Sequence, residues 1–231
     1  MVVSERLSVT STDIVYPVRD GQPVAETYDH LYAILITLEV LRQYLDGQLA
    51  TVLAHQFLYY AQGFPRLRVA PDVMVIYGVA PGGRDSYKIW EEGQVPRVIF
   101  EMTSKSTQQE DQLIKKTLYA QLGVEEYWLF DPKGEWLESP LLGYRLQEET
   151  YQPIVDLRSH VLSLQLRVEG KLIGFYDLET GQKLLIPGEM MEQIKEAKEE
   201  QRRLAQQFIE QQGRADRLAD QLRALGVDPD C

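Results

Sequence analysis

The chain has 231 residues, 44% of them hydrophobic and 26% charged, a composition typical of a globular protein with one good core and an appendage. Its formal net charge of -11 argues against coating nucleic acid through bulk electrostatics, because such binding depends on Lys and Arg at the phosphates. Any contact with nucleic acid would therefore need a local basic groove. The single cysteine, Cys231, excludes an intrachain disulfide and a cysteine metal cluster.

The sequence contains neither an apolar run of about 18 residues nor a basic segment followed by an apolar one at its start. The first residues, MVVSERLSVTSTDI, are polar and interrupted instead. We therefore expect no membrane span, no membrane partner and a cytoplasmic location.

The first part of the chain predicts a leader, a helix and a strand. Residues 1–25 carry turn formers without periodicity and are expected to be an irregular leader. Residues 26–45 predict an amphipathic helix, because large apolar residues recur at steps of three and four. Its expected buried stripe consists of Leu31, Ile34, Leu35, Leu38, Leu41 and Leu45. A strand is expected over 52–61, closed by Gly63 and Pro65.

The middle of the chain predicts several more strands and one helix. The strands are expected at 68–78, 96–107, 125–132, 144–146, 162–168 and 172–176. A loop containing Gly and Pro joins the first two of them. The helix is expected over 108–123, with Thr107 as its N-cap and Gly123 as its end. This order predicts an α/β fold with a mixed sheet flanked by helices, in one domain over 26–186.

The C-terminal segment, residues 187–231, has a different pattern. Steps of three and four alternate without a break along Ile194, Ala197, Gln201, Leu204, Phe208, Gln211, Ala215, Leu218, Leu222 and Leu225. Such spacing is typical of a coiled coil, so we expect a homodimer through residues 190–225. Glutamine and alanine on this seam and Gly213 within it weaken the pattern. A solvated helix that packs on its own domain is the alternative.

Two acids, Asp72 and Glu101, each interrupt an apolar stretch, RVAPDVMVIYG (68–78) and PRVIFEMTSKST (96–107). Burying a lone carboxylate is costly, so such a group is usually paired, hydrogen-bonded or bound to a metal. Because their strands are expected to be neighbours, the two acids suggest a divalent-cation site. Alternation along a strand puts Glu101 on the face of Ile99 and Thr103, away from its largest apolar neighbours.

The helix over 108–123 carries two adjacent lysines that its periodicity separates. Counted from Ile114, Leu118 and Leu122 lie at about 40° and 80° around the helix axis. Lys115 lies at about 100°, on the flank of this stripe, and Lys116 at about 200°. Periodicity therefore predicts that Lys115 reaches the sheet and that Lys116 faces solvent.

The converging Asp, Glu and Lys, together with the pair Pro71-Asp72, resemble the PD-(D/E)XK nuclease superfamily. More closely, the strings PDVMVIYGV, EMTSKST and LGVEEYWLFDP resemble the Uma-two-type restriction endonuclease family, over residues from about 24 to 177. The spacing D-x3-K-x3-Y at Asp111, Lys115 and Tyr119 is part of this resemblance. It implies a restriction-endonuclease-like α/β core.

The resemblance also implies an activity, a metal-dependent DNA endonuclease that hydrolyses phosphodiester bonds. Asp72 and Glu101 would bind magnesium or manganese. The superfamily's lysine, two residues after the glutamate, is replaced here by Thr103, and the narrower family assigns its role to Lys115. Two alternatives remain open. One is a degenerate nuclease fold that binds nucleic acid or regulates, and the other is a coiled-coil interaction protein with a structural α/β head.

Five other residues have two interpretations each. Glu26, at the start of the first helix, would add a carboxylate to the metal site, or only complement the helix dipole. Ser104 and Lys105 would contact phosphate, or only belong to a loop that caps the helix. His30 and His55 have no clustered partners in the sequence, so we expect them to be packing or surface residues rather than metal ligands.

Overall fold

The computed structural model describes residues 14–19 and 27–225. Of the expected leader it includes only 14–19, and Glu26 lies outside the described residues. The chain divides into two compact units, 1–184 and 185–231. None of the helices formed by the described residues combines the length and apolar character that a membrane span requires.

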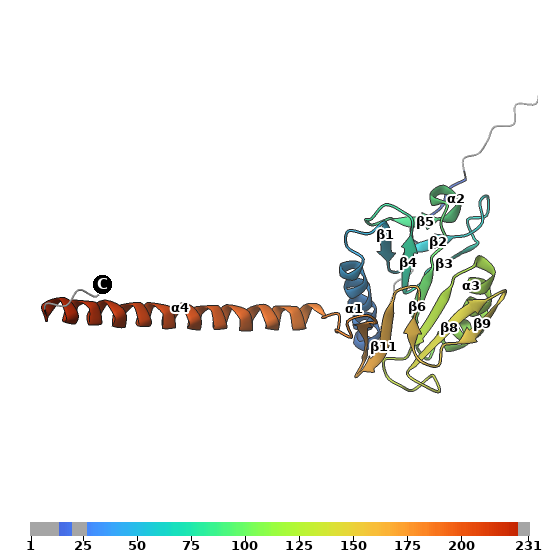
Figure 1. Ribbon diagram of the computed structural model, residues 1–231. Helices are drawn as coiled ribbons and strands as arrows, with labels where there is room; N and C mark the ends of the chain where they lie inside the picture. Colours follow the sequence, from blue (N-terminus) through green and yellow to red (C-terminus); the bar gives the residue numbers. More distant parts are fainter. Residues whose placement is uncertain (1–13, 20–26, 226–231) are drawn as a thin grey trace, which may run out of the picture. The chain divides into compact units, whose positions relative to one another are not determined.

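The first unit is built around a mixed sheet of six strands, in the order β1-β4-β6-β7-β8-β9 (Figure 1). The strands are β1 (Ala50–Leu53), β4 (Val73–Tyr77), β6 (Val98–Met102), β7 (Glu126–Phe130), β8 (Leu141–Gln147) and β9 (Thr150–Pro153). The pair β6 and β7 is parallel, whereas the other neighbours are antiparallel. This arrangement confirms the expected mixed α/β fold.

Two three-stranded sheets accompany the central one. One consists of β10 (Arg158–Ser159), β11 (Leu164–Glu169) and β12 (Leu172–Asp177), and the other of β3 (Arg68–Val69), β2 (Phe57–Tyr59) and β5 (Ser86–Lys88). The expected strand over 52–61 is therefore wrong, because β1 and β2 belong to different sheets. The chain turns between them at His55, whose φ is 61°. The expected loop before β6 contains β5 and the short helix α2 (Ile89–Glu92).

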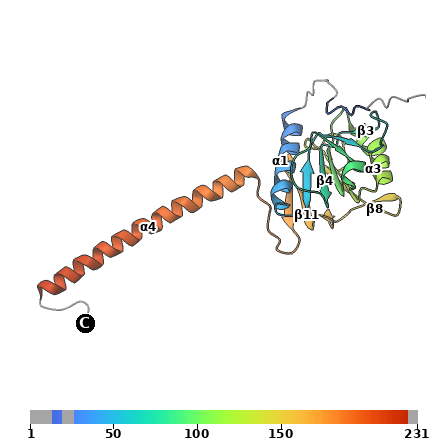
Figure 2. The ribbon, with the colours of Figure 1, turned by 90° about the horizontal axis from the view of Figure 1, so that it is seen from above.

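Helices α1 (Tyr28–Tyr44) and α3 (Lys116–Leu122) lie on opposite sides of the central sheet (Figure 2). The buried face of α1 differs from the expected stripe, since Leu31 and Leu35 are exposed. Its buried residues are Ala33, Ile34, Ile36, Thr37, Val40 and Leu41. The expected stripe was based mainly on leucines. The buried face of α1 instead includes smaller and β-branched residues from the neighbouring side of the helix.

The helix expected over 108–123 is helical from residue 108, contains a π-helical turn at Glu110–Lys115, and continues as α3 up to Leu122, with Gly123 as the C-cap. Its expected orientation holds for Leu118 and Leu122, which pack against the core, and for Lys115, which reaches Glu101, but it is wrong for Ile114, which is 68% exposed. A π-helical turn bonds residue i to i+5, so a constant step of 100° does not hold through it. The expectation for Lys116 is also wrong, since its Nζ lies 3.4 Å from the centroid of the Tyr144 ring.

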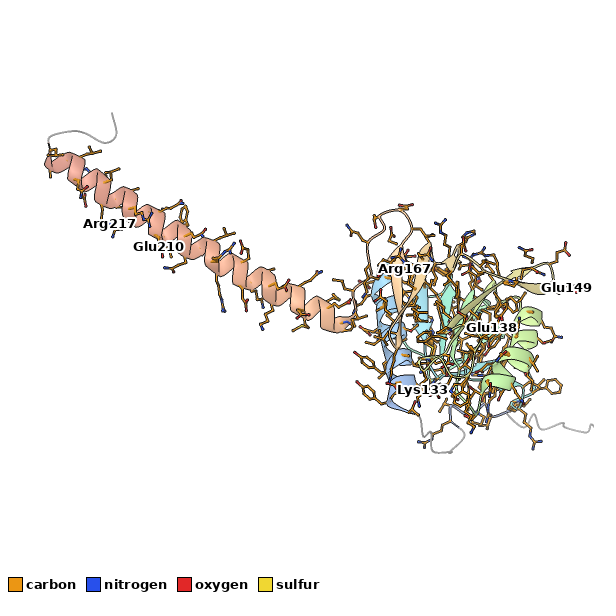
Figure 3. All side chains as sticks on the ribbon, turned by 90° about the horizontal axis from the view of Figure 1, so that it is seen from below. Lys133, Glu138, Glu149, Arg167, Glu210 and Arg217 are labelled. Carbon is orange, nitrogen blue, oxygen red and sulfur yellow. The ribbon has the colours of Figure 1, made fainter. Side chains whose placement is uncertain are left out.

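The second unit consists mainly of one helix, α4 (Pro187–Ala224), which spans 38 residues. Glu210 and Arg217 lie along it in Figure 3. Large apolar side chains are exposed on this helix, among them Ile194, Leu204 and Phe208. The single long helix expected for this segment is confirmed, and its pairing with a second copy stays a prediction.

Candidate active site

A pocket of about 610 Å³ lies where β4 begins and β6 ends, and both Asp72 and Glu101 line it. The two strands are antiparallel, with Val73 opposite Phe100 and Met74 opposite Ile99. Continuing this register by one residue puts Asp72, just before β4, opposite Glu101. Directly opposed residues share a face of the sheet and have Cβ atoms about 5 Å apart. The register thus brings the two acids together at one end of the sheet.

Glu101 is a buried carboxylate with two side-chain donors. It is 1% exposed. Its Oε1 accepts a hydrogen bond of 2.7 Å from the Tyr119 hydroxyl, and its Oε2 accepts one of 2.9 Å from Lys115 Nζ. Burial raises the pKa of Glu101 to about 8, against the opposing effect of the Lys115 charge, and Asp72 and Asp111 raise it further. Removing water from this carboxylate therefore favours its neutral form.

Lys115 lies between two buried acids. Its Nζ is 2.9 Å from Glu101 Oε2 and 2.9 Å from Asp111 Oδ1. Burial alone would lower the pKa of Lys115, but the charges of Glu101, Asp111 and Asp72 raise it above its usual range. The Tyr127 hydroxyl donates to the Asp111 carbonyl at 2.9 Å and so fixes the first turn of the helix to the sheet. Lys115 therefore remains a fixed ammonium at neutral pH.

Asp72 is held by the backbone and flanked by two histidines. Its Oδ2 accepts a hydrogen bond of 2.6 Å from the Met102 N–H, and its Oδ1 lies 3.1 Å from His55 Nε2. His30 Nε2 lies 3.8 Å from Asp72 Oδ2. Both histidines were expected to be packing or surface residues. No spacing in the sequence connects them to Asp72, because His30 lies at the start of α1 and His55 lies in the turn after β1.

Ser104 and Lys105, the expected phosphate contacts, also line the pocket. The Ser104 N–H donates to Thr107 Oγ1 at 3.1 Å, and the Ser104 and Ser106 hydroxyls lie 3.1 Å apart. Thr107 therefore closes this loop with its side chain, and the helical residues begin directly after it, at Gln108. The loop forms one wall of the pocket.

Two contacting residues, Asp111 and Tyr119, entered the sequence interpretation through the spacing D-x3-K-x3-Y, and helical periodicity also puts Asp111 at about 60°, within the stripe of Ile114, Leu118 and Leu122. The structure brings both to Glu101 or Lys115 by direct contact. That spacing was the signal that could have identified them, since positions four apart on a helix share a face.

The family comparison agrees with this geometry. The model of the family Uma2, described as "Putative restriction endonuclease", matches residues 5–173. The chain belongs to the Uma2 family. The resemblance found in the sequence is thereby confirmed, and family membership indicates a restriction-type nuclease.

A structural comparison found a crystal structure from Anabaena variabilis ATCC 29413, described as a "putative nuclease belonging to DUF820". It is 14% identical to this Uma2 chain with a TM-score of 0.43, and the match covers 59% of this chain and 72% of the other. A search of curated proteins gave no significant match.

The oxygen atoms of this Uma2 pocket supply some, but not all, of the ligands of a hard cation. Within the described ranges, no three His, Cys, Asp or Glu side chains are grouped closely enough to hold a metal ion. Asp72 and Glu101 supply carboxylate oxygens, which magnesium and manganese prefer, and magnesium usually keeps several waters beside one or two carboxylates. Thr103 Oγ1 is a buried oxygen at the same pocket that has no hydrogen-bond partner among the described residues. The residues therefore fit a cation that water or substrate also coordinates.

Proposed function

We propose that this Uma2 chain is a metal-dependent DNA endonuclease that hydrolyses phosphodiester bonds. The observation that carries the proposal is the buried carboxylate of Glu101, which opens onto a pocket beside Asp72 and contacts the Lys115 ammonium. A buried acid with a raised pKa and a specific charged partner, in a pocket, is typical of a functional site. As part of the core alone, these buried charges would only be costly.

Asp72 and Glu101 are the proposed ligands of magnesium or manganese. When bound, such an ion polarises the scissile phosphate and lowers the pKa of the attacking water. The family suggests this cofactor, and the two carboxylates support it by their chemistry.

The chain's own residues have separate roles in this proposal. Lys115 carries a permanent positive charge into the pocket, where it stabilises the charge that develops on the phosphate. Asp111 holds the Lys115 ammonium from the other side, at 2.9 Å. Tyr119 fixes Oε1 of Glu101 by its hydroxyl and so sets the direction in which this carboxylate faces the pocket. These contacts preorganise the charges before substrate binds.

Removing divalent cations tests the proposal directly. We expect the purified chain to cleave plasmid and single-stranded circular DNA with magnesium or manganese, and to stop in EDTA, because the ion that would polarise the scissile phosphate and activate the water is then absent. Gel assays with metal titration measure this effect, and Asp72→Ala protein purified in parallel controls for contaminating nucleases. Cleavage that persists in EDTA would contradict the metal dependence. Absence of cleavage of both DNAs with either metal would contradict the nuclease activity.

The exposed apolar side chains of α4 support a second proposal, self-association. We propose that this helix pairs with a copy from another chain, which would cover the seam from Ile194 to Leu225.

A truncated chain that ends at Pro187 is therefore expected to be monomeric, whereas the full chain should have twice its mass of 26.6 kDa. Light scattering on both proteins measures the difference. Leu204→Gln with Phe208→Gln should dissociate the dimer as well, while Glu200→Gln, off the seam, should not. A full chain of 26.6 kDa in solution would contradict the proposal.

A further inference from the structure

One wall of the pocket is a loop that the sequence interpretation passed over, residues 131–137. Asp131 is buried, and its carboxylate accepts four backbone hydrogen bonds, at 3.0, 2.9, 2.5 and 3.2 Å, from Lys133, Gly134, Trp136 and Leu137. Gly134 has a φ of 66°, which a glycine adopts without strain. The four hydrogen bonds fix this loop before any ligand arrives.

The loop presents an aromatic ring and a positive charge at the pocket. Trp136 is half-buried and Lys133 is exposed, and both line the same pocket as Asp72 and Glu101. Figure 3 shows Lys133 at the periphery of the first unit. From the neighbouring loop, Lys105 Nζ lies 6.0 Å from the centroid of the Trp136 ring. The indole, the two acids and two lysines therefore line one pocket, and the Lys105 ammonium is the one that lies near the indole ring.

These two lysines are the local basic feature that an acidic chain needs for a polyanion. In the part of the chain that the structure describes, neither Lys105 nor Lys133 forms an ion pair with a carboxylate. Many of the other lysines do, for example Lys171 with Asp29. Ammonium groups that are not neutralised by the protein remain available for phosphate oxygens.

We propose that Trp136 is a stacking platform for one base of a DNA strand that lacks a pairing partner there, with Lys105 and Lys133 on its phosphates. This inference rests on the proposed nuclease function and names its substrate class, single-stranded or locally unpaired DNA. Inside a duplex both faces of a base are covered by its neighbours, so an indole ring stacks only on a base that has left the stack. Stacking tolerates any base, because every base has a π-face.

Equilibrium binding in EDTA tests the inference without cleavage. The probes are a fluorescein-labelled single strand of 12 nucleotides of mixed sequence and the duplex of the same sequence. We expect the full chain to bind the single strand at least about 10-fold more tightly than the duplex, the size of one base-aromatic stack. Fluorescence anisotropy measures both affinities.

Substitutions at Trp136 separate stacking from folding. Trp136→Ala should weaken single-strand binding by about 10-fold and leave duplex binding unchanged, while Trp136→Phe, which keeps a ring, should lose less than about 3-fold. Phe64→Ala is the matched control, because Phe64 is an exposed aromatic residue that is not among those lining the pocket. It should bind like the unmodified chain.

The lysines should show in the salt dependence. For a single strand, each phosphate contact contributes about 0.7 to the slope of log affinity against log salt, so Lys105→Ala and Lys133→Ala should each lower its magnitude by about 0.7. Lys116→Ala is the control, because this ammonium stacks on Tyr144 beside a different pocket. It should leave the slope unchanged.

Either of two binding results would overturn the inference: equal affinity for single strand and duplex, or full single-strand affinity in Trp136→Ala. The proposed nuclease function fails separately. A chain that prefers the single strand through Trp136 but cleaves no DNA with magnesium or manganese would keep this inference and lose the enzyme. A chain that cleaves duplex DNA at an unchanged rate in Trp136→Ala would keep the enzyme and lose the inference.

Discussion

Alanine at Asp72 or at Glu101 is expected to lower the rate of DNA cleavage on the order of 10³-fold or more. Loss of a metal ligand removes charge stabilisation worth several kcal/mol, and each 1.4 kcal/mol is about tenfold in rate. Single-turnover cleavage with saturating magnesium measures the effect. Glu125→Gln is a suitable control, because this acid pairs with Arg97 and is not among the residues that line the pocket.

Without metal, the ionised carboxylate of Glu101 is expected to lower the stability of the folded chain. The pKa of Glu101 is raised by burial to about 8 in the folded chain, above its value when unfolded, so the folded state binds the extra proton. Stability therefore falls as pH rises from about 4.5 to about 8. In EDTA, Glu101→Gln should lose less stability than the unmodified chain between pH 6 and pH 8.5, because glutamine has no such proton to lose.

Thermal unfolding at both pH values tests this expectation, with circular dichroism as the check that Glu101→Gln folds. Should the variant unfold at a much lower temperature at every pH, Glu101 would be a structural residue. A cleavage rate within tenfold of the unmodified chain in either alanine variant would contradict their role as metal ligands.

Removal of the Lys115 ammonium is expected to lower the saturated cleavage rate by about 10²- to 10³-fold, the usual effect of losing one preorganised charge at a reaction site. Lys116→Ala should leave the rate within about twofold. The reason is the geometry, since Lys115 Nζ contacts Glu101 in the pocket whereas Lys116 Nζ stacks on Tyr144. Single-turnover cleavage at saturating DNA and metal compares the two variants.

The choice of substitution matters at Lys115, because its removal leaves two buried acids without their cation. Breaking a buried ion pair in this way costs about 3–5 kcal/mol. Lys115→Met keeps the apolar stem and can be compared with Lys115→Ala at a temperature where both are folded, as thermal unfolding shows. Full activity in a folded Lys115→Met chain would contradict the assignment, and a matching loss in Lys116→Ala would indicate an effect of the helix as a whole.

The sequence by itself determined the features that depend on short stretches of chain. Local physical effects are enough to interpret three of these features. They are the two acids in apolar strands, Gly123 at the end of a helix, and the three-four spacing after Ile194. The cost of a buried charge, the left-handed turn that glycine adopts and the 3.6-residue period all act within a few residues. The mixed sheet, the long helix and the position of Asp72 beside Glu101 were accessible for this reason.

Only the tertiary structure decided which distant residues contact one another and which face of the helix after β6 is directed at the sheet. His30 and His55 reach Asp72, and Trp136 reaches Lys105, across long stretches of sequence, so no local period connects them. The ion pair of Lys115 with the buried Glu101 sets the orientation of its helix and leaves Ile114 in solvent. An uncompensated charge in the core costs more than one apolar side chain gains there, and that balance exists only once the strands have come together.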